Sequence, residues 1–144
     1  MKKIFTLFLI ALSASSYSQI SIGMHLGSSN KNMVAGLHSQ YQFNNGFTLG
    51  VNMSSHTDNI NPAYFQTRFG QTLGNEEAFS IQPYIGYSYS IQNTDQKIYG
   101  GHFTTGALMQ YQLNDIALLY TDINIPSKKY IMFSVGIAGR FNND

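Results

Sequence analysis

Residues 33–54 read MVAGLHSQYQFNNGFTLGVNMS, and this stretch decides the fold. Apolar and polar side chains alternate along residues 33–43 and again along 47–54, which is the two-residue period of a β-strand with one apolar face. Asn45-Gly46 separates the two runs, and both residues accept the positive φ of a type I′ turn. The stretch therefore predicts a β-hairpin whose two faces differ in polarity.

The same alternation continues in both directions along the chain, and no window longer than a few residues shows a helical period of 3.6. Pro62 is expected to mark the start of one strand, because proline has no N–H to contribute to a ladder. The alternating segments lie at residues 20–27, 33–43, 47–54, 63–70, 79–91, 99–113, 117–125 and 131–141. They predict an all-β chain of eight antiparallel strands.

Soluble barrels and sandwiches also have one apolar face, so further features are needed to recognise a membrane barrel. One face of the segments is rich in Gly, Ser, Thr and Gln and the other in Leu, Ile, Phe and Tyr, which matches a polar interior and a lipid-facing exterior. Only 10% of the residues are charged, against about a quarter in ordinary soluble domains. We therefore predict a closed, up-and-down transmembrane β-barrel, whose interior is filled by side chains and leaves no open pore.

The N-terminus predicts export. Lys2 and Lys3 precede an apolar stretch at residues 4–12, which is too short to span a bilayer, and small residues follow it. We expect residues 1–18 to be a cleaved signal peptide, with cleavage at residue 18 or one later, and residues 19–144 to form an outer-membrane barrel domain. A buried N-terminal helix is the alternative.

Cysteine and charge exclude several classes of protein. The chain has no cysteine, which excludes a lipoprotein anchor, a disulfide framework and thiolate metal sites. Lys and Arg total 8 and Asp and Glu total 7, so removal of Lys2 and Lys3 leaves 6 basic against 7 acidic residues. Nucleic acid is therefore not an expected partner.

An even strand count places both ends of the mature chain on the periplasmic side. The connections at residues 28–31, 57–61, 93–97 and 126–129 then face outward, and those at 44–46, 70–78 and 114–115 face the periplasm. Lys31, Lys97, Lys128 and Lys129 all fall in the outward set, where we expect them to contact the phosphates of outer-leaflet lipopolysaccharide; simple solvation of the loops is the alternative. Phe43, Phe47, Phe79, Tyr111 and Phe141 fall at the periplasmic ends of strands and predict an aromatic girdle.

Polar side chains on the inward face predict a network in the lumen. Its expected members are His25, His38, His102, Arg68, Arg140 and Asp122. Because an unpaired charge in such an interior is costly, each needs a partner, and Glu76 or Glu77 is the expected partner of Arg68. A metal site formed by the histidines is the alternative. A packed polar interior is favoured, and neither metal nor cofactor is predicted.

The strand count, the alternation and the last run, from Phe133 to Phe141, resemble the small eight-stranded outer-membrane barrels of the OmpX and OmpA-transmembrane type. The last run is similar to the aromatic-ended strand that the barrel assembly machinery recognises, which implies that Phe141 is an assembly signal and that this machinery is a partner. Here three residues follow the aromatic. A second resemblance, of residues 61–64 and 120–125, is to pieces of the longer PorP/SprF proteins of the type IX secretion system.

These observations predict a non-catalytic outer-membrane protein with a structural or surface-interaction role. Lipid A-modifying barrels resemble the chain in fold, but their catalytic His, Ser and carboxylate have no complete counterpart here: His102 is followed by Phe103-Thr104, and no Glu follows Glu77. The alternatives are a component of a secretion machinery, a lipid A acyl hydrolase or transferase, and a soluble lipocalin-like barrel. The sequence indicates neither a ligand nor an oligomeric state.

Overall fold

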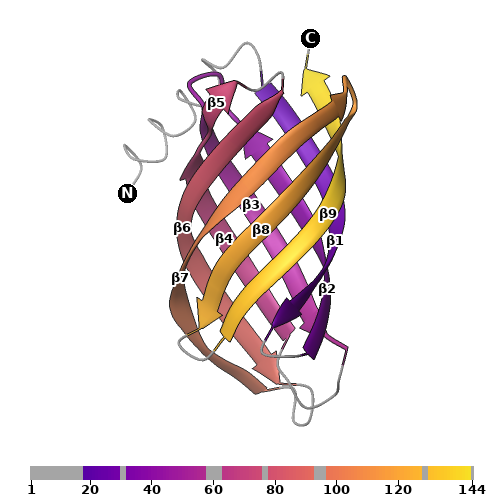
Figure 1. Cartoon of the computed structure of the whole chain (residues 1–144). Helices are drawn as coiled ribbons and strands as arrows, with labels where there is room; N and C mark the ends of the chain where they lie inside the picture. Colours follow the sequence, from indigo (N-terminus) through magenta and orange to yellow (C-terminus); the bar gives the residue numbers. More distant parts are fainter. Residues whose placement is uncertain are drawn as a thin grey trace, which may run out of the picture.

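The computed structural model describes residues 18–29, 32–57, 63–75, 78–92, 97–127 and 130–143. These residues form one antiparallel sheet of tilted strands that closes on itself as a barrel (Figure 1). The closed, all-β, up-and-down fold predicted from the alternation is confirmed. Within these ranges there is no helix long and apolar enough to cross a membrane. Residues 1–17 of the predicted signal peptide lie outside the described ranges.

The strands follow one another in chain order as hairpins. Their bounds are β1 Ser18–Ser29, β2 Asn32–Gln42, β3 Phe47–His56, β4 Ala63–Gln71, β5 Leu73–Asn75, β6 Phe79–Gln92, β7 Lys97–Asn114, β8 Ala117–Ser127 and β9 Tyr130–Asn143. Each predicted segment coincides with one long strand to within a few residues. The pairing of β1 with β9 and of β4 with β6 closes the barrel.

β5 is a continuation of β4. Gly70 of β4 pairs with Tyr84 of β6, and Leu73 of β5 pairs with Ile81 in the same register. The interruption falls at Thr72, whose backbone N–H donates to the carbonyl oxygen of Gly46 over 2.7 Å. The barrel therefore has eight strands, as predicted. The connection predicted at residues 70–78 is shorter than expected, because the chain keeps its pairing with β6 up to residue 75.

The hairpin between β2 and β3 turns at the predicted place, but the predicted two-residue type I′ turn at Asn45-Gly46 is wrong: the loop has three residues, 44–46, and Gly46 takes the left-handed position. Gly46 has a φ of 78°, which glycine adopts without strain. The N–H of Gly46 donates to the carbonyl oxygen of Phe43 at 2.9 Å. The N–H of Phe43 donates to the carbonyl oxygen of Phe47 at 2.8 Å. The Asn45 side chain adds an acceptor for the N–H of Phe47 at 3.2 Å.

Burial in the barrel is inverted relative to a water-soluble protein. Along β3, the exposed Phe47 and Met53 lie on the opposite face from the buried Thr48 and Asn52. The same pattern runs around the wall, where the exposed large side chains include Ile22, Met24, Leu26, Leu37, Ile85, Ile131, Phe133 and Ile137. A soluble lipocalin-like barrel would place its apolar face inside, so this exterior is that of a barrel surrounded by lipid.

The two ends of the barrel differ. We call the end at which β1 begins and β9 ends the terminal end, and the opposite one the far end (Figure 1). Aromatic side chains gather at the terminal end: the rings of Phe47 and Phe69 stack with centroids 5.5 Å apart, and Phe79 pairs with Tyr111. Of the predicted girdle, Phe47, Phe79, Tyr111 and Phe141 are exposed, and Phe43 is half-buried.

β7 departs from the predicted alternation near its start. His102 pairs with Ser88, but Tyr99 pairs with Ser90, so β7 holds one extra residue at Gly100-Gly101. This is a β-bulge, in which two residues of β7 oppose one residue of β6. A side chain at Gly101 would collide with the ring of Tyr87, which explains a glycine there. The regular strand predicted from Tyr99 to Leu113 is therefore interrupted at Gly100-Gly101.

Candidate functional site in the barrel lumen

An ion pair between Arg68 and Asp122 lies within the lumen. Nη2 of Arg68 is 2.7 Å from Oδ2 of Asp122, and the two side chains are 3% and 2% exposed. Arg68 belongs to β4 and Asp122 to β8, which are not neighbours in the sheet, so the pair crosses the lumen. The prediction of Glu76 or Glu77 as the partner of Arg68 is corrected: the partner is Asp122, and both glutamates lie outside the described residues.

Asp122 accepts further hydrogen bonds. The hydroxyl of Tyr84 donates to its Oδ1 at 2.8 Å, and Nδ2 of Asn124 donates to its Oδ2 at 3.0 Å. The guanidinium of Arg68 lies 4.5 Å from the centre of the Tyr84 ring and also donates to Oε1 of Gln66 at 2.8 Å. The Asp122 carboxylate therefore accepts from three donors. The Arg68 guanidinium contacts this carboxylate, the Gln66 amide oxygen and the face of the Tyr84 ring.

The network continues through neutral side chains to the opposite wall. The amide of Gln66 reaches Oδ1 of Asn124 at 3.3 Å and the hydroxyl of Thr104 at 3.4 Å. On the other side, the imidazole of His25 lies 3.3 Å from the Tyr120 hydroxyl and 3.2 Å from that of Ser54. These contacts link β1, β3, β4, β7 and β8 across the interior.

The structure brings four of the six predicted lumen residues together. His25, His38, Arg68 and Asp122 are buried in one region, where the ring of His38 packs 5.2 Å from that of Tyr120. Arg140 lies nearer the terminal end and donates to Oε1 of Gln112 at 2.7 Å. His102 is exposed beside the bulge and does not belong to the buried cluster. In the described part of the chain, no three His, Asp or Glu side chains converge as metal ligands.

The remaining predicted site residues lie at the two ends. Phe141 is 60% exposed at the terminal end, where it pairs with Ile20. Lys97 is the first residue of β7, so it is a strand residue where a connection was predicted. Lys31, Lys128 and Lys129 lie outside the described residues, and the predicted lipopolysaccharide contacts stay a prediction.

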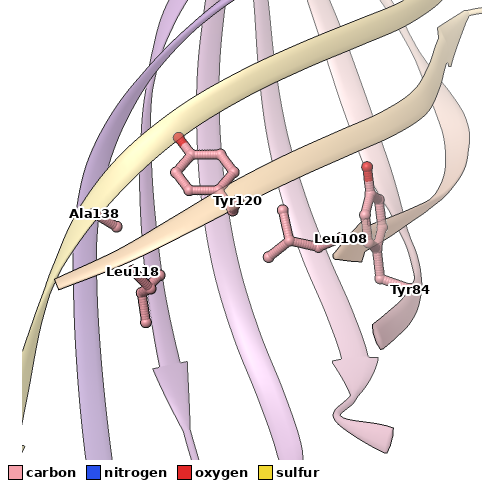
Figure 2. Close-up of a cluster of buried hydrophobic side chains, with 5 residues drawn as sticks. All are labelled: Tyr84, Leu108, Leu118, Tyr120 and Ala138. Carbon is pink, nitrogen blue, oxygen red and sulfur yellow. The ribbon is translucent and has the colours of Figure 1, made fainter. Parts of the chain in front are cut away.

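Apolar side chains close the lumen on both sides of the polar network. Towards the far end, Val34, Tyr64 and Met132 form a buried cluster. Towards the terminal end, a second cluster contains Leu108, Leu118 and Ala138 together with the rings of Tyr84 and Tyr120 (Figure 2). A pocket beyond it, lined by glutamines, Leu118 and Arg140, has a volume of about 10 Å³, roughly that of one water molecule. The interior is therefore a packed plug.

Glycines on adjacent strands make room for the large lumen side chains. A methyl group added at Gly36, Gly106 or Gly136 would overlap the ring of His25, Tyr84 or Tyr120, respectively. The direct cross-strand pairs are His25 with Gly36 and Gly136, Arg68 with Gly50 and Gly86, and Tyr84 with Gly70 and Gly106. Sequence reasoning placed these glycines on the inward face but missed their partners, because partners are visible only once the register is known.

Gly106→Ala is expected to lower the free energy of unfolding by about 1–3 kcal/mol, the cost of forcing extra volume into a packed interior. The added methyl would meet both the Tyr84 ring and the carbonyl oxygen of Ile123. Urea unfolding in lipid vesicles measures the loss. The control is Gly139→Ala, whose methyl would have only ordinary contacts, 3.5 Å or more away. Equal losses for the two variants would contradict the packing described.

Comparison with known proteins identifies the fold but no sequence relative. No protein-family model matches the chain, and no curated protein matches it significantly. The N-terminal β-barrel domain of Pseudomonas aeruginosa OprF is similar with a TM-score of 0.70 at 12% identity, covering 85% of this chain and 97% of that one. Ail, the attachment invasion locus protein of Yersinia pestis, has a TM-score of 0.59 at 15% identity, covering 88% and 99%. Neisserial surface protein A has a TM-score of 0.52 at 11% identity, covering 86% of this chain and 94% of that one. The predicted resemblance to small eight-stranded outer-membrane barrels is confirmed at the level of fold.

Proposed function

We propose that this chain is an integral outer-membrane protein with a structural or surface-interaction role, in which the barrel is an anchor and neither a pore nor an enzyme. The observation that carries the proposal is the filled lumen: the Arg68–Asp122 network lies between two buried apolar clusters. Its carboxylate, cation and amides bond to one another in the interior. The ends of the barrel are then the surfaces left for contacts with other molecules.

The height of the apolar exterior supports placement in an outer membrane. Outward-facing apolar residues extend from Met33 on β2 to Phe43, the residue after its end, from Phe79 to Tyr89 on β6 and from Ile131 to Phe141 on β9, ten residues apart in each case. At about 3.3 Å per residue and a tilt of about 40°, ten residues rise ~25 Å, the height of the apolar band of outer-membrane barrels. No charged residue faces outward on these three strands within that height.

A surface-interaction role is favoured over a purely structural one by the shape of the far end. Among the described residues, β6 and β7 extend furthest at that end, where their pairing continues to Gln92 and Lys97 (Figure 1). Among proteins of similar fold, Ail is named for attachment, and one structure holds it in complex with the heparin analogue sucrose octasulfate. We include in the proposal assembly through Phe141 and contact of the lysines with lipopolysaccharide.

The purified barrel, reconstituted in a planar lipid bilayer, is expected to give no stable conductance steps, because both apolar clusters block a water path. A porin inserted in the same bilayer is the positive control. Heat-modifiable gel migration of the same sample shows that the barrel is folded. Discrete channel openings from the folded barrel would contradict the closed lumen, and purification as a detergent-free soluble monomer would contradict the membrane placement.

A further inference from the structure

The turn between β2 and β3, at the terminal end, contains the one Asn-Gly step of the sequence, Asn45-Gly46. Asn45 is exposed, so water reaches its side chain. Its Oδ1 accepts a hydrogen bond from the backbone N–H of Phe47 at 3.2 Å. This contact closes a small ring of atoms that contains both Cγ of Asn45 and the backbone nitrogen of Gly46. A side-chain amide carbon and a backbone nitrogen are thus held together in an exposed turn.

We propose that Asn45 is a site of spontaneous modification, at which the asparagine is converted to aspartate or isoaspartate. The backbone nitrogen of Gly46 attacks Cγ of Asn45, so that a new N–C bond forms and the Cγ–Nδ2 bond breaks. Nδ2 leaves as ammonia and takes the proton of the Gly46 nitrogen with it. Water then opens the resulting cyclic imide at either of its carbonyl carbons, which gives aspartate in one case and isoaspartate in the other. Water is the only co-reactant.

Two features of the turn favour this attack. Glycine has no Cβ, so no side chain on Gly46 obstructs the approach of its nitrogen. The N–H of Phe47 donates to the side-chain oxygen of Asn45, which gains negative charge as the new bond forms. A donor that is already aimed at an oxygen about to become charged lowers the barrier of a reaction. The folded turn therefore supplies part of the stabilisation that the reaction needs.

One hydrogen bond opposes the attack. The N–H of Gly46 donates to the carbonyl oxygen of Phe43 at 2.9 Å, and the nitrogen must leave this bond before it can react. Exposed turns open locally at a small cost in free energy, far below the cost of unfolding the whole protein. This bond therefore slows the reaction without preventing it.

The turn between β7 and β8, at the same end of the barrel, supplies a matched comparison. Oδ1 of Asn114 accepts a hydrogen bond from the N–H of Ile116 at 3.0 Å, which is the same contact with the second residue along the chain. Asn114 is exposed as well. The residue that follows it is Asp115, whose side chain crowds the backbone nitrogen and whose carboxylate opposes the loss of a proton from that nitrogen. Asn114 is therefore expected to react far more slowly than Asn45.

The two products change the terminal end in different ways. Aspartate keeps an oxygen that can accept from the N–H of Phe47, and it adds one negative charge to the turn. Isoaspartate adds a carbon atom to the main chain between residues 45 and 46, which lengthens the turn. The carbonyl oxygen of Gly46 accepts from the N–H of Thr72 at 2.7 Å, so a longer turn also affects the interruption between β4 and β5.

Incubation of the folded barrel in detergent micelles at mildly alkaline pH, followed by peptide mass spectrometry, tests the proposal. The peptide that contains Asn45 should first lose the mass of ammonia and then gain that of water, at least about ten times faster than the peptide that contains Asn114. Chromatography should separate its aspartate and isoaspartate forms, and heat-modifiable gel migration shows that the barrel stays folded. An intact Asn45 in the folded barrel, or equal conversion of Asn45 and Asn114, would overturn the proposal.

Two substitutions exchange the residues that follow the two asparagines. Asp115→Gly should raise the rate at Asn114 at least about tenfold, and Gly46→Asp should lower the rate at Asn45 by a similar factor, because the attack requires near-contact of the reacting atoms. Aspartate is among the residues found at a positive φ such as the 78° of Gly46, so the turn can still form. An unchanged rate in either variant would overturn the proposal. Because these measurements are made in micelles, they do not depend on the membrane placement.

Discussion

Asp122→Ala is expected to lower the free energy of unfolding of the barrel by about 3–5 kcal/mol, because it leaves the Arg68 guanidinium buried without its anion. Arg68 would retain the amide oxygen of Gln66 and the face of the Tyr84 ring, which do not neutralise a charge. The Tyr84 hydroxyl and the Asn124 amide would also lose their acceptor. Urea titration in lipid vesicles, followed by heat-modifiable migration, measures the loss.

The double variant Arg68→Met, Asp122→Leu is the control for this effect. It removes both charges and fills the space with apolar volume, which for buried ion pairs is often neutral or stabilising. Most of the stability lost in Asp122→Ala should therefore return. A double variant as unstable as the single one would show that the cost arises from lost packing and not from an unpaired charge.

Ile85→Arg is expected to lower the stability in a bilayer by about 2–4 kcal/mol, the cost of Arg on the lipid face near the midplane of a barrel. Ile85 is 65% exposed on the outer wall, where it pairs with Phe69 and Thr105 about halfway along β6. The lipid there would have to accommodate a guanidinium.

The matched control is Ile91→Arg on the same strand and the same face. Ile91 pairs with Ala63 and Ile98 close to the far end, where the cost should fall to about 0–1 kcal/mol. Urea titrations of both variants in vesicles of one lipid composition give the difference. Equal losses would contradict the position of the membrane along the barrel.

The strand count and the facing of the side chains could be predicted from the sequence because both depend on neighbouring residues alone. Met24 beside His25, and Leu49 beside Thr48, already indicate which face meets lipid, and the two-residue period carries this along each strand. The position of the turn could be predicted for the same reason, because the positive φ of Gly46 depends on the residue itself and not on distant parts of the chain.

The contacts across the lumen could not be predicted in this way. The partner of Arg68 is 54 residues away on a strand that is not its neighbour, and its height in the barrel depends on the register of every strand between. The two-residue period of their strands places Tyr84 and Tyr120 on the inward face, but their hydrogen bonds to Asp122 and His25 depend on the register of the strands as well. The bulge at Gly100-Gly101 arises from a single extra residue, which alternation of apolar and polar residues cannot detect in a glycine pair.

The cross-strand glycines also bear on how the barrel assembles. If one strand slips by two residues against its neighbour, every side chain stays on the same face of the sheet. The alternation of apolar and polar residues is then satisfied as well as before. The slip would move Gly106 away from Tyr84 and bring Leu108 or Thr104 opposite that ring, and the same change would affect the glycines beside His25 and Arg68. Misaligned hairpins would therefore be too crowded to close. The glycines therefore select one register among those that the alternation of apolar and polar residues allows.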